Sequence, residues 1–192
     1  MVLSHAVLFP HAMMPLFIFE PRYREMLNYA LEQQRMFCIG VPLPHVEEVV
    51  GPEDLFPIAG LGLVRACVGR EDGTSHLILQ GVARVRLSDW LQDEPFRIAS
   101  LEELPSAPLV DLGEAEELSH LLLDAAETAP GAEGAPRATL NAQMRQITDP
   151  AILADVVAHT YIHDPWRRQA LLEETDVVCR LRTVLAYLRE DQ

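Results

Sequence analysis

Three side chains that can bind a metal ion recur at intervals of four residues near the C-terminal end: Asp155, His159 and His163. Because an α-helix has about 3.6 residues per turn, this spacing would place all three on one side of a continuous helix. Two imidazoles and a carboxylate form a ligand set that zinc accepts. A histidine pair at this spacing is more often structural or exposed, and His163 precedes Asp164, an expected helix cap. We therefore predict no metal site, and keep these three residues as the candidate that a zinc measurement would test.

The residue types give little basis for nucleophilic catalysis. The chain contains no lysine, so it cannot by itself build a Walker A nucleotide site, a serine–lysine hydrolase or a Schiff-base enzyme. No serine stands in a Gly-x-Ser-x-Gly motif. The chain has three cysteines, an odd number, and they are widely spaced: Cys38, Cys67 and Cys179. We therefore expect buried, reduced thiols. We predict that the protein is not an enzyme and has no cofactor. The open alternative is a hydrolase site whose nucleophile and base come together only in the folded protein.

Charge and hydropathy restrict the partners. The net charge is −14, and binding to nucleic acid or to an anionic membrane depends on basic side chains that release counterions from phosphate. No apolar run reaches the roughly 18 residues of a membrane span, and no signal peptide is evident at the N-terminus. With 49% hydrophobic residues the composition is that of a globular protein. We expect a cytoplasmic protein that binds neither nucleic acid nor membrane.

Two groups of residues are candidates for binding. Arg84 and Arg86 alternate with apolar residues in a strand pattern, which would direct both guanidinium groups to the solvent side, where they could bind an acidic peptide or pair with glutamates. Met13, Met14 and Phe17 could form an apolar surface that holds unfolded polypeptide, because methionine adapts to varied partners. The alternative for these apolar residues is packing in the core.

The first part of the chain has the patterns of strands and one helix. Residues 16–19 form a short apolar run typical of a buried strand, and Pro21 begins a helix predicted over residues 20–34. Asp72-Gly73 is the expected turn of a long hairpin. Glycines inside its arms indicate bulges or a sharply coiled sheet. The glycines are Gly60, Gly62 and Gly81. The other predicted strands cover residues 36–41, 58–70 and 74–88 and a segment that begins at Pro95.

The second part has helical patterns. Leucine spacing predicts a helix over residues 113–128, and a weaker pattern predicts another over residues 137–147. Asp149-Pro150 and Asp164-Pro165 each offer a capping carboxylate followed by proline at a first helical position, so each should begin a helix. A further helix should begin near Thr175. We expect these helices to form a bundle.

Several motifs along the chain resemble one known family. Phe9-Pro10, then Pro15-Leu16-x-Ile18-Phe19-Glu20-x-Arg22-Tyr23, is similar to the opening of the Lon protease N-terminal domain. The resemblance continues through the strands and into the helices. The further matching segments are Leu77-x-Leu79-x-Gly81-x-x-Arg84, Pro95-Phe96-x-Ile98-Ala99, Leu153-Ala154-Asp155, Gln169-x-Leu171-Leu172-Glu173 and Arg180-Leu181.

The resemblance implies an α+β protein. It implies a PUA-like β-barrel with one helix in residues 1–108 and a helical bundle in residues 109–192. It also implies the role of that domain, which is recognition of protein substrates or partners, in a stand-alone form without ATPase or peptidase domains. We therefore expect a non-catalytic protein that binds unfolded polypeptide or a partner protein. The alternative is a PUA-like module for a small ligand or RNA, against which the net charge argues.

Overall fold

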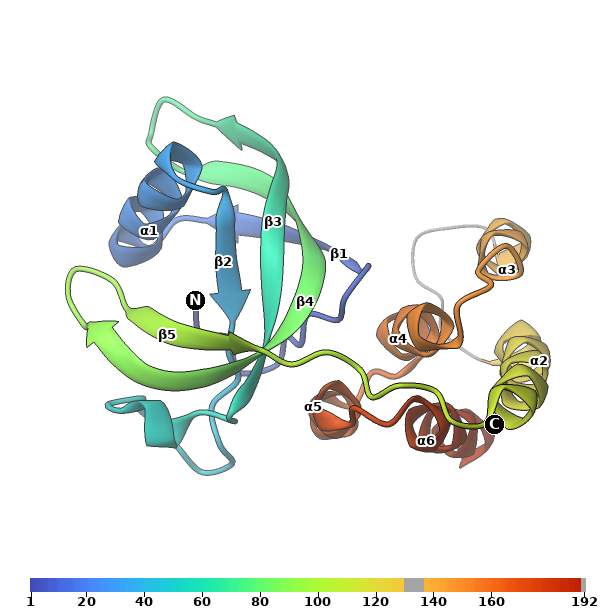
Figure 1. Ribbon diagram of the computed structural model, residues 1–192. Coiled ribbons are helices and arrows are strands. Elements are labelled where there is room, and N and C mark those ends of the chain that lie inside the picture. The colour runs from blue at the N-terminus through green and yellow to red at the C-terminus, as the bar shows by residue number, and fades with distance from the viewer. Residues whose placement is uncertain (130–136, 191–192) are drawn as a thin grey trace. The chain divides into compact units, whose positions relative to one another are not determined.

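The computed structural model describes residues 1–129 and 137–190 (Figure 1). The chain divides into two compact units, Met1–Leu104, here named the barrel unit, and Pro105–Gln192, here named the bundle unit. The sequence patterns predict the boundary after residue 108. The strands, with one helix among them, come first and the remaining helices follow, so the predicted α+β class is confirmed. Among the described residues, no helix combines the length and the apolar character that crossing a membrane requires.

The barrel unit is one antiparallel sheet with a single α-helix. The strand order is β1-β4-β3-β2, and β5 also pairs with β4. Figure 1 shows the strands curled around a common interior with α1 beside β2. The predicted helix and hairpin are both present. The elements are β1 (Met13–Ile18), α1 (Pro21–Glu32), β2 (Met36–Ile39), the 3₁₀ turn η1 (Pro52–Asp54), β3 (Ile58–Gly69), β4 (Ser75–Gln92) and β5 (Ile98–Glu103).

Strand β4 organises the sheet because it is long enough to pair with two strands, one after the other, along one edge. Its first part pairs with β1, placing Phe17 opposite His76, and its second part pairs with β5. Its other edge pairs with β3, with register shifts at Leu61/Gly62 and Val64/Ala66. Such irregularities bend a strand and increase its twist, which a curled sheet requires. The β3–β4 turn is fixed by Asp72, whose carboxylate accepts hydrogen bonds from Thr74. Gly73 follows at φ 81°.

Two glycines in the strands leave room for another part of the backbone. A Cβ at Gly60 would lie 2.0 Å from the carbonyl oxygen of Leu8, and one at Gly81 would lie 1.9 Å from that of Phe9. Leu8 and Phe9 are completely buried, in a segment that has no strand pairing of its own. The glycines therefore allow close approach of residues 8–9 to the sheet, a reason that strand patterns alone could not reveal.

The bundle unit consists of helices that pack on one another, with α2, α4 and α6 in mutual contact. Both predicted aspartate caps are confirmed. The Asp149 carboxylate accepts from the backbone N–H of Ala151, and that of Asp164 accepts from Arg167. The elements are α2 (Leu112–Thr128), α3 (Arg137–Met144), α4 (Pro150–Tyr161), α5 (Pro165–Glu173) and α6 (Val177–Glu190).

A buried ion pair lies inside the bundle unit. Arg180 Nε of α6 lies 3.1 Å from Asp155 Oδ1 of α4, and the two side chains are 0% and 3% exposed. The same guanidinium donates to the carbonyl oxygen of Glu174 at 2.6 Å and to Ser106 Oγ at 3.0 Å. Arg180 therefore joins two helices, the turn before α6 and the segment that precedes α2.

Candidate functional site

The three candidate metal ligands do not share one helix side. Helix α4 ends at Tyr161, so His163 lies beyond it, and the predicted alignment is wrong. The helix stops because Asp164 takes an extended conformation before Pro165 and caps the next helix. Asp155 is buried against Arg180, and His159 Nδ1 lies 2.7 Å from Arg168 Nη2. Among residues 1–129 and 137–190, no three side chains of the metal-binding types converge.

The two candidate arginines have different environments. Arg86 is exposed, whereas Arg84 is only 4% exposed, so the prediction of a solvent-facing Arg84 is wrong. Strand alternation assigns a residue to one side of a sheet but does not tell what covers that side. The structure therefore keeps only Arg86 as an accessible cation of this pair.

The cysteines also differ from one another. All three are free thiols, as expected. Cys38 and Cys67 are half-buried and Cys179 is exposed, so the predicted burial is only partial for the first two and wrong for Cys179. Burial raises the pKa of the Cys38 thiol to about 11, so little of the nucleophilic thiolate is present near neutral pH.

The candidate apolar residues of β1 divide between the two sides of the strand. Met14 is 8% exposed and belongs to the core cluster with Ile18, so its assignment to a binding surface is wrong. Met13 and Phe17 are 50% and 44% exposed. Since successive side chains of a strand point to opposite faces, the odd-numbered residues of β1 form an outer row. The predicted buried run over residues 16–19 is therefore buried only at alternate positions.

The outer row of β1 continues across two more strands. Pro15 pairs with Ile78 of β4, which pairs with Ala66 of β3, and Phe17 pairs with His76. On β3, His76 in turn lies opposite Val68, which is 67% exposed. A shallow depression of about 400 Å³ follows this surface. We name it the outer apolar face and define it by Met13, Pro15, Phe17, Phe19, Ala66, Val68, His76 and Ile78.

Aromatic rings hold the centre of the outer apolar face in place. The rings of Phe17 and His76 stack with centroids 4.6 Å apart, and those of Phe17 and Phe19 lie 5.8 Å apart. Phe19, at the end of β1, is 59% exposed. Stacked cross-strand rings stabilise the sheet while their other surfaces remain available to a ligand. The face therefore offers a fixed apolar platform rather than a closed pocket.

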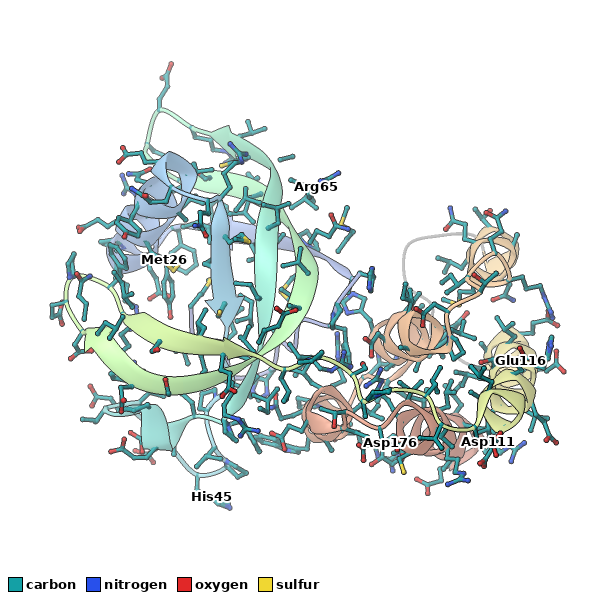
Figure 2. The ribbon with its side chains drawn as sticks, in the orientation of Figure 1. Met26, His45, Arg65, Asp111, Glu116 and Asp176 are labelled. Atoms are coloured by element: carbon teal, nitrogen blue, oxygen red, sulfur yellow. The ribbon has the colours of Figure 1, made fainter. Side chains whose placement is uncertain are left out.

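The charges near the outer apolar face are basic, although the whole chain is acidic. The Arg70 guanidinium lies 5.9 Å from the centroid of the Phe17 ring, and Arg65 is exposed on β3. In Figure 2, Arg65 points away from the interior of the barrel unit. Arg70 also interacts with the nearby Asp72 carboxylate, whose pKa is lowered first by hydrogen bonds from Thr74 and further by Arg70. A ligand on this face would thus meet apolar side chains with cations at the edge.

Sequence reasoning missed Phe19, Val68 and His76. The signal for Phe19 was present, because it shares the odd-numbered period of Met13 and Phe17. Val68 and His76 required the hairpin register, which follows from the position of the Asp72-Gly73 turn once both arms are aligned. The hairpin register could be worked out from the sequence, but the exposure of the outer apolar face could not be predicted from it.

Comparison with known proteins defines the family. The model of the ATP-dependent protease La (LON) substrate-binding domain matches residues 1–190. The chain belongs to this family. The Lon protease of Desulfosudis oleivorans is 27% identical over 192 residues, which is 98% of this chain and 23% of that protease. The Lon protease of Paraburkholderia phytofirmans is 34% identical over 188 residues, which is 94% of this chain and 22% of that protease. This Lon-type chain thus spans about a quarter of the length of the relatives it matches.

A solved structure supports the same fold. The N-terminal domain of a Mycobacterium avium complex Lon protease superimposes with a TM-score of 0.76 at 16% identity, covering 100% of this chain and 97% of that one. At this level of identity the likeness establishes the fold alone. The predicted resemblance to the Lon N-terminal domain family is therefore confirmed, by the family match over nearly the whole chain and by the shared architecture.

Proposed function

We propose that this Lon-type chain is a non-catalytic protein that binds unfolded polypeptide, or an apolar segment of a partner protein, through the outer apolar face. The observation that carries the proposal is the exposed aromatic platform of Phe17 and Phe19, which continues through His76 of β4 to Val68 of β3. Single exposed apolar residues are normal on proteins, but a contiguous apolar surface across several strands marks an interaction surface. Membership in a substrate-binding family supports the same role.

The form of the face fits an unfolded ligand. The depression is shallow and extends over three strands, so it can accept many side chains without demanding one shape. Met13 at one end adds a flexible thioether that adapts to different partners. We expect modest affinity, with a dissociation constant on the order of micromolar, and no requirement for ATP. Free thiols at all three cysteines support a reducing, cytoplasmic setting.

A titration with a permanently unfolded protein tests this proposal. Reduced and carboxymethylated α-lactalbumin is titrated with the wild-type chain and with the double variant Phe17→Gln/Val68→Thr. Both altered residues are exposed, so the fold should tolerate the change. Loss of two apolar contacts should weaken binding by about tenfold or more.

The matched control removes a similar amount of exposed apolar surface elsewhere. Leu91→Gln/Val110→Thr alters residues that are 71% and 97% exposed and lie outside the outer apolar face. This control should bind like the wild type. Equal weakening by both double variants, or no binding of the unfolded protein to the wild type, would remove the proposed function.

A further inference from the structure

The barrel unit contains a second apolar site, distinct from the outer apolar face. A pocket of about 280 Å³ opens between α1, β2 and the β4–β5 hairpin. We name it the barrel pocket. It is lined mainly by apolar and aromatic side chains, which include Met26, Tyr29, Met36, Leu61, Trp90 and Phe96. Engineered apolar cavities of about 150 Å³ bind benzene, so this volume is sufficient for a large apolar side chain.

Aromatic rings form part of the lining of the barrel pocket. Tyr29 is 48% exposed, and its ring centroid lies 5.5 Å from that of Phe96. In the β4–β5 connection, the Arg97 guanidinium lies 4.2 Å from the centroid of the Trp90 ring of β4. Figure 2 shows Met26 directed from α1 toward the interior of the barrel unit. Rigid rings combined with a flexible thioether suit an apolar side chain entering from solvent.

An acidic depression adjoins the barrel pocket. It measures about 290 Å³ and shares Met1, Val2, Met26, Phe96 and Arg97 with the pocket. Three acidic residues, Glu48, Asp93 and Glu94, contribute to its lining.

The arginines of the acidic depression already have partners. Arg97 Nε donates to Asp93 Oδ1 at 2.9 Å, and Arg22 Nε donates to Glu20 Oε2 at 2.9 Å. Within the described residues, Glu48 and Glu94 have no ion-pair partner. The depression therefore presents two uncompensated carboxylates next to an apolar pocket. This arrangement complements an apolar group that has a cation close by.

We propose that the barrel pocket binds one large apolar side chain of an extended polypeptide, while Glu48 and Glu94 bind a basic residue two positions away. Side chains two positions apart lie on the same side of an extended chain, about 7 Å from each other, so one segment can reach both depressions. The inference rests on the proposed polypeptide binding and adds a selective contact to the sequence-tolerant outer apolar face. Its ligand class is a segment of the type Phe-x-Lys or Phe-x-Arg.

The chain provides its own probe for this contact. Trp90 and Trp166 are its two tryptophans, so the variant Trp166→Phe leaves Trp90 as the single fluorescent reporter inside the pocket. Gly/Ser peptides with a central Phe-Ser-Lys, Phe-Ser-Glu or Ala-Ser-Lys are titrated into this variant. The Phe-Ser-Lys peptide should change the Trp90 emission, the Ala-Ser-Lys peptide should not, and the Phe-Ser-Glu peptide should bind about fivefold more weakly because of charge. Anisotropy of a labelled Phe-Ser-Lys peptide with the wild-type chain gives a second measurement.

Further variants separate the two depressions. Ala99→Leu introduces a larger side chain into the pocket lining and should reduce Phe-Ser-Lys binding. Glu48→Gln/Glu94→Gln should remove the preference for lysine, whereas the control Glu25→Gln/Glu71→Gln, which neutralises exposed acids outside both depressions, should keep it. An unchanged Trp90 signal together with unchanged anisotropy, or equal affinity for the lysine and glutamate peptides, would overturn the inference.

Failure of this inference can be told apart from failure of the proposed function. Phe17→Gln/Val68→Thr should leave the Trp90 response to the Phe-Ser-Lys peptide intact, because those residues do not line the barrel pocket. If the unfolded protein binds through the outer apolar face but the peptide gives no Trp90 response, only the pocket inference is wrong. If the peptide binds but the unfolded protein does not, the pocket stands and the role of the outer face is wrong.

Discussion

In the barrel unit, large apolar side chains on one face of the sheet stay in solvent, whereas in the bundle unit a charged pair is enclosed. Phe17, Phe19 and Val68 are between 44% and 67% exposed, and Asp155 and Arg180 are at most 3% exposed. Exposed apolar surface lowers stability unless a partner covers it, while a buried ion pair is tolerated only when its hydrogen bonds are fixed. We infer that the barrel unit contributes the contacts with other molecules and that the polar contacts of Arg180 hold the bundle unit's helices in register.

The largest expected effect tests the bundle side of this comparison. Arg180→Met leaves the Asp155 carboxylate buried without its cation, which should lower the free energy of unfolding by about 3–5 kcal/mol. Urea denaturation followed by circular dichroism measures the change. Arg182→Met on the same helix breaks an exposed pair with Glu114 and should cost less than about 1 kcal/mol. Equal losses for the two variants would mean that the buried pair has no special structural role.

The next effect tests how closely the barrel unit is packed. Gly81→Ala brings a methyl group within 1.9 Å of the Phe9 carbonyl oxygen, so residues 8–9 must move away from the sheet. We expect a loss of about 1–3 kcal/mol in the free energy of unfolding. Gly69→Ala is the control, because the nearest atom to its added carbon is Ser75 Oγ at 3.8 Å, an ordinary contact distance. A tolerated Gly81→Ala would contradict the close approach.

The smallest effect compares one thiol from each unit. Cys38 lines the barrel pocket, and burial raises its pKa from 9.0 to about 11. A raised pKa leaves less thiolate at a given pH, so at pH 8 Cys38 should hold about 100-fold less thiolate than an unperturbed thiol. Its alkylation by iodoacetamide, followed by mass spectrometry, should be correspondingly slow and should accelerate as the pH rises toward 11. Cys179 on the bundle surface should react faster, and the reverse order would show that Cys38 is not enclosed.

Much of the fold could be predicted because its signals are local. Asp149-Pro150 and Asp164-Pro165 mark helix starts through capping chemistry that involves only neighbouring residues. Asp72-Gly73 likewise marks a hairpin, since glycine accepts the positive φ of the turn. The end of α4 before His163 follows from the same Asp-Pro signal, which outweighs the four-residue spacing of Asp155, His159 and His163.

The candidate site was only partly predictable because burial depends on tertiary contacts. Met13, Met14 and Phe17 have similar apolar character, yet Met14 faces the core and the other two face solvent. Period-two alternation separates Met14 from the others, but which side is covered is decided by α1 and by strands distant in the sequence. Tertiary contacts also decide that Arg84 is buried, although its place in the strand pattern matches that of the exposed Arg86. The barrel pocket combines residues from α1 to β5, so no spacing in the sequence could indicate it.

Hydroxyl-radical footprinting tests the central claim most directly, because it reports the solvent access of individual side chains in the intact protein. Oxidation of each residue is measured by mass spectrometry with and without saturating unfolded α-lactalbumin. The account predicts that the ligand protects Met13 and Phe17 of the barrel unit several-fold, while the exposed Leu112 and Leu121 of the bundle unit keep their rates. Protection of Leu112 and Leu121 with unchanged oxidation of Met13 and Phe17 would contradict it.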